Sequence, residues 1–303
     1  MSSTMSTSTG RVISIQSHVV SGYVGNKSAT FPLQVLGFEV DPINSVQFSN
    51  HKGYPTCLGQ ILDSGQLAEL YQGLKANNLQ EYTHILTGFI GSQSFLKQVA
   101  DVVRDLKASN PDIVYVCDPV MGDNGKMYVP AELLPIYKES IIPLADVITP
   151  NQYEAELLTG QKIHNEETAL QAMQTLHKMG AKTVVISSSD LGNEEILVAL
   201  GSITRNGSKP VGIKLQIPRL PASFTGTGDL FAALLLAWLH KYPEDLKLVC
   251  EKTVSTLQHI LRRTLKWSEE EKSDPRRAWR DLRIIQSKKD IEDPEICVQA
   301  EIL

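Results

Sequence analysis

Short β-rich runs alternate with stretches of helical periodicity along most of this chain, and this alternation constrains the fold more than any other feature. The β-rich runs cover residues 12–15, 38–40, 85–86, 113–117, 183–186 and 211–217. Apolar residues recur at helical spacing in residues 29–36, 67–74, 95–106, 169–179 and 230–240. Strands that alternate with helices of this length predict an α/β fold, with a mostly parallel central sheet and helices on both faces.

No segment rich in Pro, Gly or Ser divides the chain into domains. A length of 303 residues would suggest roughly two domains, but without a linker we expect a single domain over residues 11–303. Residues 1–10 are rich in Ser and Thr and are expected to be a disordered leader. The charge-dense residues 268–283 predict a solvated loop or helix, and the alternating Ile296, Val298, Ala300 and Ile302 predict a terminal edge strand.

Composition excludes several classes of protein. The net charge is −5, from 29 basic and 34 acidic residues, which gives no electrostatic footprint for nucleic acid or for an anionic membrane. The longest apolar run, residues 230–239, is half of the ~20 residues that a membrane-spanning helix needs. The four cysteines lie far apart, and the seven histidines form no pair at helical spacing, so neither disulfides nor zinc are indicated. We expect a cytoplasmic protein.

Polar side chains follow each predicted strand. Ser17 and His18 follow the first run, Thr87 follows the run at 85–86, Asp118 follows residues 113–117, and Ser187–Asp190 follow residues 183–186. In an open parallel sheet, ligands bind beyond the carboxyl ends of the strands, where such residues converge. Polar residues end most strands in any protein, so each one alone has a plain structural explanation.

The sharpest local motif is Gly226-Thr227-Gly228-Asp229, directly before an apolar helix. Two glycines permit a tight turn, and the first turn of the helix supplies unpaired backbone N–H groups and the positive end of the helix dipole. This predicts an anion site, suited to the charge on a phosphoryl group during transfer. An acidic residue in a first helical turn is also common for dipole reasons alone.

Two further segments leave alternatives open. Asn151 and Glu154, three residues apart at a helix start, are either a capping pair or ligands of a hydrated divalent cation. Asp118 and Asp123 enclose a Gly-containing connection that either binds a cation or forms turns. Gly122 and the glycine at 125 would permit a mobile flap that excludes water.

Together these motifs, in this order, resemble those of the ribokinase-like superfamily of small-molecule kinases, and within it the vitamin B6 kinase family. The segments that carry the resemblance are residues 12–19, 22–26, 31–37, 44–51 (Asn-Ser-Val-Gln-Phe-Ser-Asn-His), 116–123 (Val-Cys-Asp-Pro-Val-Met-Gly-Asp), 149–156 (Thr-Pro-Asn-Gln-Tyr-Glu-Ala-Glu), 226–229 and 290–295. The resemblance implies a three-layer ribokinase-like fold. It implies ATP-dependent phosphorylation of the 5′-hydroxymethyl group of pyridoxal, pyridoxine and pyridoxamine, by a homodimer.

The resemblance also assigns roles to residues. Asp229 would be the catalytic base, and the amides of Gly226, Thr227 and Gly228 would form the anion hole. ATP would be bound by Asp118, Asn151, Glu154, Ser187, Ser188, Leu220, Pro221, Ala222 and Thr227. The substrate would be contacted by Ser17, Val46, Phe48, Lys52, Phe89, Tyr128, Gly228 and Asp229. A divalent cation such as Mg²⁺ would lie near Asp118 and Glu154, and a monovalent cation (K⁺ or Na⁺) near Asp123 and Thr149.

Three positions depart from that family pattern. Lys52 stands where a Thr is often found, and could meet the aldehyde of pyridoxal or turn to solvent; we expect solvent, because lysine is rarely buried without a partner. Phe89 stands where a Tyr is common, which removes a hydroxyl. The segment at residues 123–128 is short compared with that of some animal relatives in the family, so we expect a flap of short reach.

Rival functions are a hydroxymethylpyrimidine kinase of the same fold and a non-catalytic sensor of nucleotide or pyridoxal phosphate. The stretch 45–51 argues against the first, and the combined presence of base, anion hole and metal residues argues against the second. A dehydrogenase is excluded because Phe231 stands where a dinucleotide fingerprint needs its third glycine. A P-loop is excluded because Met127 follows Lys126 in place of Ser or Thr.

Overall fold

A computed structural model describes residues 9–204, 210–270 and 275–303. The strands in these residues are β1 (Arg11–Val19), β2 (Glu39–Phe48), β3 (Gly59–Ile61), β4 (His84–Thr87), β5 (Val114–Cys117), β6 (Gly122–Asp123), β7 (Lys126–Met127), β8 (Val147–Ile148), β9 (Thr183–Asn193), β10 (Ile196–Ile203), β11 (Val211–Pro218) and β12 (Ala300–Ile302). The helices are α1 (Asn26–Val35), α2 (Ser64–Ala76), α3 (Gln93–Ser109), α4 (Leu133–Ile136), α5 (Gln152–Thr159), α6 (Glu166–Lys178), α7 (Thr227–Lys241), α8 (Leu246–Glu270), α9 (Pro275–Ala278) and α10 (Lys288–Glu292).

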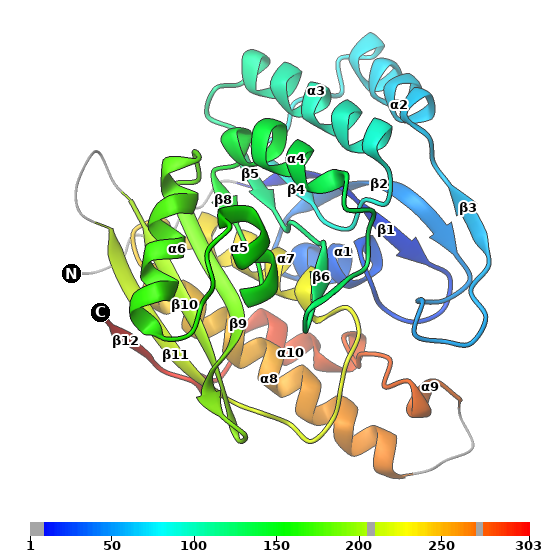
Figure 1. Cartoon of the computed structure of the whole chain (residues 1–303). Helices are drawn as coiled ribbons and strands as arrows, with labels where there is room; N and C mark the ends of the chain where they lie inside the picture. The colour runs from blue at the N-terminus through cyan, green and yellow to red at the C-terminus, as the bar shows by residue number, and fades with distance from the viewer. Residues whose placement is uncertain (1–8, 205–209, 271–274) are drawn as a thin grey trace.

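One ten-stranded sheet runs through the molecule in the order β12-β11-β10-β9-β8-β5-β4-β1-β2-β3 (Figure 1). Its middle, from β9 to β2, is parallel. Both ends are antiparallel, with β10, β11 and β12 at one end and β3 at the other. The predicted α/β class with a mostly parallel sheet is confirmed. All carboxyl ends of the parallel strands therefore meet at one edge of the sheet.

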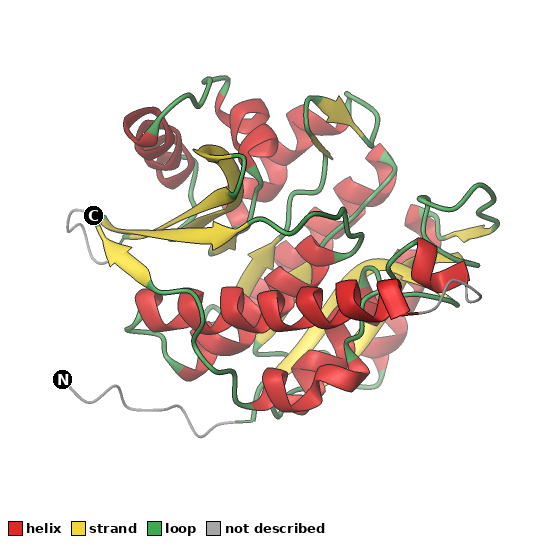
Figure 2. Ribbon diagram, turned by 90° about the horizontal axis from the view of Figure 1, so that it is seen from below, coloured by secondary structure: helices red, strands yellow, loops and turns green. Residues whose placement is uncertain are grey.

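Helices cover both faces of the sheet, as Figures 1 and 2 show. One apolar core lies between the sheet and the face that carries α2, α3, α4, α5 and α6, and includes Ile13, Ile85 and Leu96. The second lies under α1, α7 and α8 and includes Val12, Leu86 and Leu234. Adjacent residues of β1, Val12 and Ile13, thus enter opposite cores because side chains of a strand alternate between faces.

Helix α7 is an inner helix. Every residue from 230 to 238 is buried, and the helix packs against both α1 and α8 as well as the sheet. A helix enclosed in this way must be apolar on all sides, which explains the continuous run of aliphatic residues. The apolar side chains that fix this helix also fix the polar motif at its start.

Several sequence-based boundaries need correction. Ser17 and His18 lie inside β1, not after it, because β1 continues to Val19 beside β2 past a register shift. Ser187–Asp190 likewise lie inside β9, which extends beyond the parallel sheet to pair with β10. The terminal edge strand exists but is confined to residues 300–302. Helix α8, with 25 residues, was not predicted.

The ends of the predicted domain can be placed only in part. Residues 1–8 of the expected leader lie outside the described residues, whereas the Gly10 carbonyl accepts a hydrogen bond from Glu39 and so belongs to the fold. Within the charge-dense segment, α8 continues to Glu270 and α9 covers residues 275–278.

Candidate active site

The parallel strands bring the predicted residues to one edge of the sheet. Ser17 of β1 is the register partner of Val46 of β2. Phe89 follows β4, Asp118 follows β5 and Thr149 follows β8, each within two residues of its strand end. This convergence is what the strand-end pattern predicted, and it places substrate and nucleotide candidates side by side along the edge.

The start of α7 is shaped to receive an anion. Gly226 has φ +85°, and no side chain caps the first turn of the helix. A Cβ at Gly226 would lie 2.2 Å from the carbonyl oxygen of Tyr23, so only glycine fits. In contrast, α2 and α6 are capped by the side chains of Asp63 and Asn165. The first amides of α7 therefore remain available to a ligand.

Asp229 lies in the first turn of α7. Its side chain is half-buried, and burial raises the pKa of its carboxyl, an effect that a hydrogen bond from the Gly25 amide partly offsets. Gly25 has φ +53°, and a Cβ there would lie 2.0 Å from the Ser17 carbonyl oxygen. The end of β1, the start of α1 and the start of α7 are therefore packed together around one carboxylate.

Asp118 is buried next to this turn, with 4% of its surface exposed. A Cβ at Gly228 would lie 3.3 Å from Asp118 Oδ2, which puts the carboxylate beside the anion hole. Burial, together with the nearby charges of Glu154 and Asp229, raises the pKa of Asp118 well above its usual value. The buried hydroxyl of Thr149 faces Asp118 and opposes that rise, but forms no well-aligned hydrogen bond.

Asn151 and Glu154 form a capping box at the start of α5. Asn151 Oδ1 accepts from the Glu154 amide at 2.9 Å, and Glu154 Oε2 accepts from the Asn151 amide at 2.9 Å. Glu154 Oε1 also accepts from the amides of Met121 and Gly122. Burial nevertheless raises the pKa of Glu154 to about 7. The capping alternative is thus confirmed, and both residues also anchor the segment after Asp118.

The expected flap is a short β-hairpin formed by β6 and β7. Asn124 and Gly125 at its tip have φ of +48° and +75°, as a two-residue hairpin turn of the primed type requires. Asn151 Nδ2 donates to the Gly122 carbonyl at 2.8 Å and holds the hairpin on α5. Asp123 accepts from Asn124, and Tyr128 after the hairpin is 57% exposed.

The remaining nucleotide candidates lie on β9 and on the loop before α7. The amide and hydroxyl of Ser187 both donate to the Pro150 carbonyl, and Ser188 is half-buried. Leu220 packs on the apolar core while its carbonyl accepts from the Ala222 amide, and the intervening Pro221 is exposed. Strand β9 and the loop before α7 thus bring these residues to the same edge of the sheet as Asp118 and Glu154. No hydrogen bond in the described part of the chain joins them to these two carboxylates.

The candidate substrate residues form the other half of the site. Ser17 and Val46 are buried, and Phe48 and Phe89 are half-buried. Lys52 is exposed, but its ammonium nitrogen lies 5.3 Å from the ring centre of Phe89 and 6.0 Å from that of Phe48. The expectation that Lys52 turns to solvent is confirmed. Its ammonium group also lies over both rings, because aromatic faces attract a cation.

A buried polar network behind this half was not predicted. His51 Nε2 lies 3.2 Å from Asp281 Oδ1, and the Tyr54 hydroxyl donates to Asp281 Oδ2 at 3.1 Å. The Gly53 amide donates to His51 Nδ1 at 3.1 Å, so the imidazole holds the loop that carries Lys52. A separation of about 230 residues leaves no local signal from which the contact could have been inferred.

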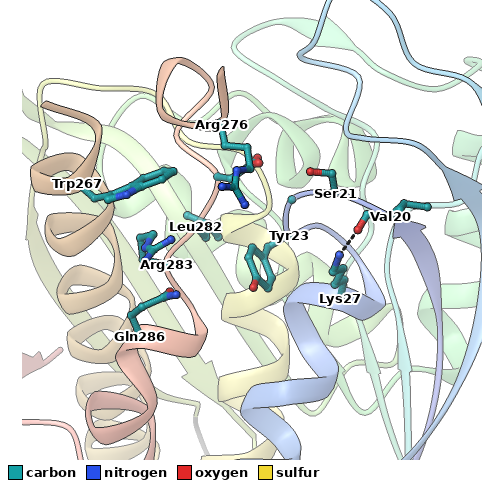
Figure 3. Close-up of a pocket in the computed structure, with 11 residues that line it drawn as sticks. Val20, Ser21, Tyr23, Lys27, Trp267, Arg276, Leu282, Arg283 and Gln286 are labelled. Carbon is teal, nitrogen blue, oxygen red and sulfur yellow. Dashed lines mark hydrogen bonds between the residues drawn. The ribbon is translucent and has the colours of Figure 1, made fainter. Parts of the chain in front are cut away.

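A cavity of about 250 Å³ lies beside the turn between β1 and α1 (Figure 3). It is lined by residues of the β1–α1 turn, the end of α8 and the segment 276–286. Arg283 lies 4.6 Å over the ring of Trp267, and Lys27 donates to the Val20 carbonyl. None of the predicted site residues lines this cavity, but Asp281, which contacts His51 and Tyr54, does.

Comparisons with known proteins identify the family. The family described as phosphomethylpyrimidine kinase matches residues 77–273. A pyridoxal kinase of Sus scrofa is 57% identical over 98% of this chain and 96% of its own length. A structure of pyridoxal kinase from Leishmania donovani in complex with ADP and pyridoxamine is 35% identical, with a TM-score of 0.89 over 97% of this chain and 99% of that one. The chain belongs to the pyridoxal kinase family.

Membership of the pyridoxal kinase family is consistent with the match to phosphomethylpyrimidine kinases. That match begins at residue 77 and so excludes β1, β2 and the loop with Lys52. The pyridoxal kinases, in contrast, match over nearly the full length, including the segment at 45–51. No helix in the described part of the chain is both long and apolar enough to cross a membrane.

The residues present fit a divalent cation. Asp118 and Glu154 are buried carboxylates, and the charge of Glu154 adds to the cost of ionising Asp118. The buried Thr149 Oγ1 beside Asp118 lacks a well-aligned partner. In the described ranges, no three Cys, His, Asp or Glu side chains gather closely enough to hold a metal between them. Such a donor set suits Mg²⁺, which keeps several waters and takes other ligands from phosphate.

Proposed function

We propose that this chain transfers the γ-phosphoryl group of ATP to the 5′-hydroxymethyl group of pyridoxal, pyridoxine and pyridoxamine. Its family membership supports the reaction. The relative from Leishmania donovani is described in complexes with ADP and pyridoxamine and, at 36% identity, with ADP and pyridoxine. Further support comes from the start of α7, where Asp229 shares a helical turn with backbone amides that no side chain caps.

The observation that carries the proposal is the position of Asp229. Its side chain is half-buried, the nearby Gly25 amide offsets part of the rise in its pKa that burial causes, and it lies in the same helical turn as the uncapped amides of residues 226–228. An acceptor hydroxyl bound to Asp229 would therefore lie next to the phosphoryl group held by those amides. Proximity of this kind supplies most of the catalysis of phosphoryl transfer, because the transition state is loose.

Asp229 first orients the hydroxyl and then accepts its proton. A primary alcohol is far too weak an acid for a carboxylate to deprotonate before transfer. In a loose transition state the proton leaves late, when the new bond to phosphorus has made the hydroxyl acidic. Burial raises the pKa of Asp229, which makes the carboxylate a better proton acceptor at that moment.

Asp118 is the side chain best placed to hold a divalent cation, and Glu154 would support it. The Glu154 oxygens are already bound by three backbone amides, so we infer that Glu154 acts through water and by shaping the loop at 121–122. When bound, Mg²⁺ would neutralise charge on the phosphate oxygens of ATP. A monovalent cation beside Asp123 and Thr149 remains a prediction of the same kind.

The remaining nucleotide and substrate roles also remain proposals. Ser187 and Ser188 would meet the phosphates, and Leu220, Pro221 and Ala222 would border the adenine. Ser17, Val46, Phe48, Phe89 and Tyr128 would surround the pyridine ring. Their support is that each lies at the same edge of the sheet or on an adjoining loop.

We also propose a cytoplasmic homodimer. All four cysteines are free thiols, which suits a reducing compartment. The edge strand β3 and its surroundings expose the apolar side chains of Leu58 (70%), Ile61 (67%) and Val20 (62%), which a second copy could cover. Sedimentation of the purified chain measures its mass directly.

Replacement of Asp229 tests the reaction. Asp229→Asn keeps the shape of the side chain but removes the proton acceptor, so turnover with pyridoxal should fall by about 10²- to 10⁴-fold. Binding of ATP should change little. Asp101→Asn, on the exposed face of α3, serves as the control. The assay is ADP release with pyridoxal, pyridoxine, pyridoxamine or hydroxymethylpyrimidine. Turnover of Asp229→Asn near that of the control would reject the assignment, and no ADP release with any vitamer would favour the sensor.

A further inference from the structure

Lys52 occupies an unusual position for a lysine at the edge of a substrate site. It follows the buried His51, whose Nε2 lies 3.2 Å from Asp281 Oδ1 and whose ring packs edge-on against Tyr54. The next residue, Gly53, is near the turn that starts α7, since a Cβ there would be 3.9 Å from Thr225 Oγ1. The loop that carries Lys52 is therefore anchored at its back and adjoins the anion-site turn at its front.

The ammonium group of Lys52 lies over two aromatic side chains at the carboxyl ends of β2 and β4. The distances from the nitrogen are 5.3 Å to the Phe89 ring centre and 6.0 Å to the Phe48 ring centre. Aromatic faces attract a cation, so this contact holds the ammonium group over the two rings.

No carboxylate neutralises this charge in the described part of the chain. Asp281, the acidic residue behind the loop, is already engaged by His51 and Tyr54. Among the described residues, Lys52 forms no ion pair, and its contacts are the two aromatic rings. A ligand that packs against Phe48 and Phe89 would therefore lie near a positive charge that the same two rings hold.

We propose that Lys52 determines specificity among the B6 vitamers by disfavouring pyridoxamine relative to pyridoxine and pyridoxal. This inference rests on the proposed function. The three vitamers share the pyridine ring, the 3-hydroxyl and the 5′-hydroxymethyl group, and differ only in the substituent at position 4. That substituent is a cationic aminomethyl group in pyridoxamine at neutral pH, an uncharged hydroxymethyl group in pyridoxine and an uncharged aldehyde in pyridoxal.

The size of the effect follows from the distance between two like charges. If the aminomethyl nitrogen of bound pyridoxamine lies about 6 Å from the Lys52 nitrogen, repulsion at an effective dielectric constant between those of a protein surface and of water corresponds to about tenfold in kcat/KM. The charge is exposed, so salt should reduce the effect. Like-charge repulsion acts on pyridoxamine alone, whereas loss of packing at this position would act on all three vitamers.

The test compares kcat/KM for pyridoxamine with that for pyridoxine in the full-length protein and its variants. Lys52→Met, which keeps length and apolar character without charge, should raise the ratio of pyridoxamine to pyridoxine by about tenfold. Lys52→Arg, which keeps the charge, should leave the ratio within about twofold of wild type. Lys97→Met, on the exposed side of α3, controls for the loss of a surface charge. Added KCl should raise the ratio in the wild type and not in Lys52→Met.

Two results would overturn the inference. One is a pyridoxamine-to-pyridoxine ratio in Lys52→Met that equals that of the wild type. The other is a reduced pyridoxal adduct on Lys52 after borohydride treatment, which would mean that the side chain reacts as a neutral amine. Equilibrium binding of each vitamer without ATP separates this inference from the proposed function. A protein that phosphorylates no vitamer contradicts the function, and the vitamer affinities of Lys52→Met against wild type still decide the role of Lys52.

Discussion

Replacing Gly25 with alanine should stop catalysis by displacing Asp229, although residue 25 supplies no side chain to the reaction. Gly25 has φ +53° and ψ −133°, a backbone conformation that costs an L-residue about 1–3 kcal/mol. The added methyl group would also lie 2.0 Å from the carbonyl oxygen and 2.5 Å from the hydroxyl of Ser17. Because real contacts are longer than 3.0 Å, the backbone must shift by about 1 Å or more.

That shift acts directly on the proposed base, since the Gly25 amide lies close enough to the Asp229 carboxylate to offset part of the rise in its pKa that burial causes. A misplacement of about 1 Å at a reacting group costs about 10²-fold in rate. We therefore expect kcat of Gly25→Ala to fall by about 10²-fold or more. Strain and overpacking together should lower the free energy of unfolding by about 2–5 kcal/mol.

Gly37→Ala is the matched control. Gly37 also has a left-handed backbone, with φ +93°, but a Cβ there would meet no atom within 4 Å. It should therefore lose only the strain of about 1–3 kcal/mol, with kcat unchanged. ADP release with pyridoxal gives kcat, and urea unfolding shows that both variants are folded at the assay temperature. If Gly25→Ala turns over within about threefold of Gly37→Ala, the positioning argument fails.

Two further predictions concern pH and stability. Burial and the neighbouring His240 lower the pKa of His84 to about 3, so His84 stays neutral in the fold and gains a proton only on unfolding. The contribution of His84 to the free energy of unfolding is complete above pH 6.5 and is lost as the pH falls towards 3. At pH 5, the free energy of unfolding measured in urea should therefore have fallen by about 2 kcal/mol more in wild type than in His84→Gln. Burial would raise the pKa of Asp146, but bonds from Lys107, a backbone amide and Lys182 outweigh it and lower the pKa. Asp146→Asn should lower the free energy of unfolding by about 1–3 kcal/mol at pH 7, and this difference from wild type should shrink as the pH falls below 3.8. Thermal unfolding followed across pH measures the difference. A difference that does not shrink would contradict a stabilising role for the ion pairs.

Local sequence patterns predicted the strands and helices whose burial is visible in the spacing of their own apolar residues. The run at 113–117 became β5 because a strand buried on both faces must be apolar throughout. Apolar spacing around Leu96, Val99 and Val103 predicted α3, whose other face is exposed. Helix α8 was missed although Val249, Cys250 and Val254 are buried at helical spacing, since its charged residues hid the apolar stripe.

Long-range pairing explains the errors at strand ends. Polar residues after a β-rich run usually mark a turn, and Ser187–Asp190 have that composition. In the fold, β10 offers them a partner, and Ser189 is buried with its hydroxyl bound to the Val198 carbonyl. Whether a polar segment continues a strand depends on a neighbour that its own sequence does not contain.

The site was predictable where chemistry and local structure coincide. Gly226 and Asp229 carry their own signal, because the turn and the helix start are contiguous. The capping box of Asn151 and Glu154 was also visible, but its further bonds to the amides at 121–122 depend on the approach of two loops. The Gly25 amide and the Asp281 carboxylate could not be predicted, since nothing in their own segments indicates what they contact.

The contact between His51 and Asp281 also bears on when the protein becomes active during its synthesis. The ribosome makes the loop with Lys52 well before its buried acidic partner Asp281, which follows the last parallel strand in the sequence. A nascent polypeptide that has completed every parallel strand still lacks the group that fixes this loop. Premature termination shortly before residue 281 would therefore yield a chain that contains the turn at 226–229 but lacks the acidic partner of the loop with Lys52.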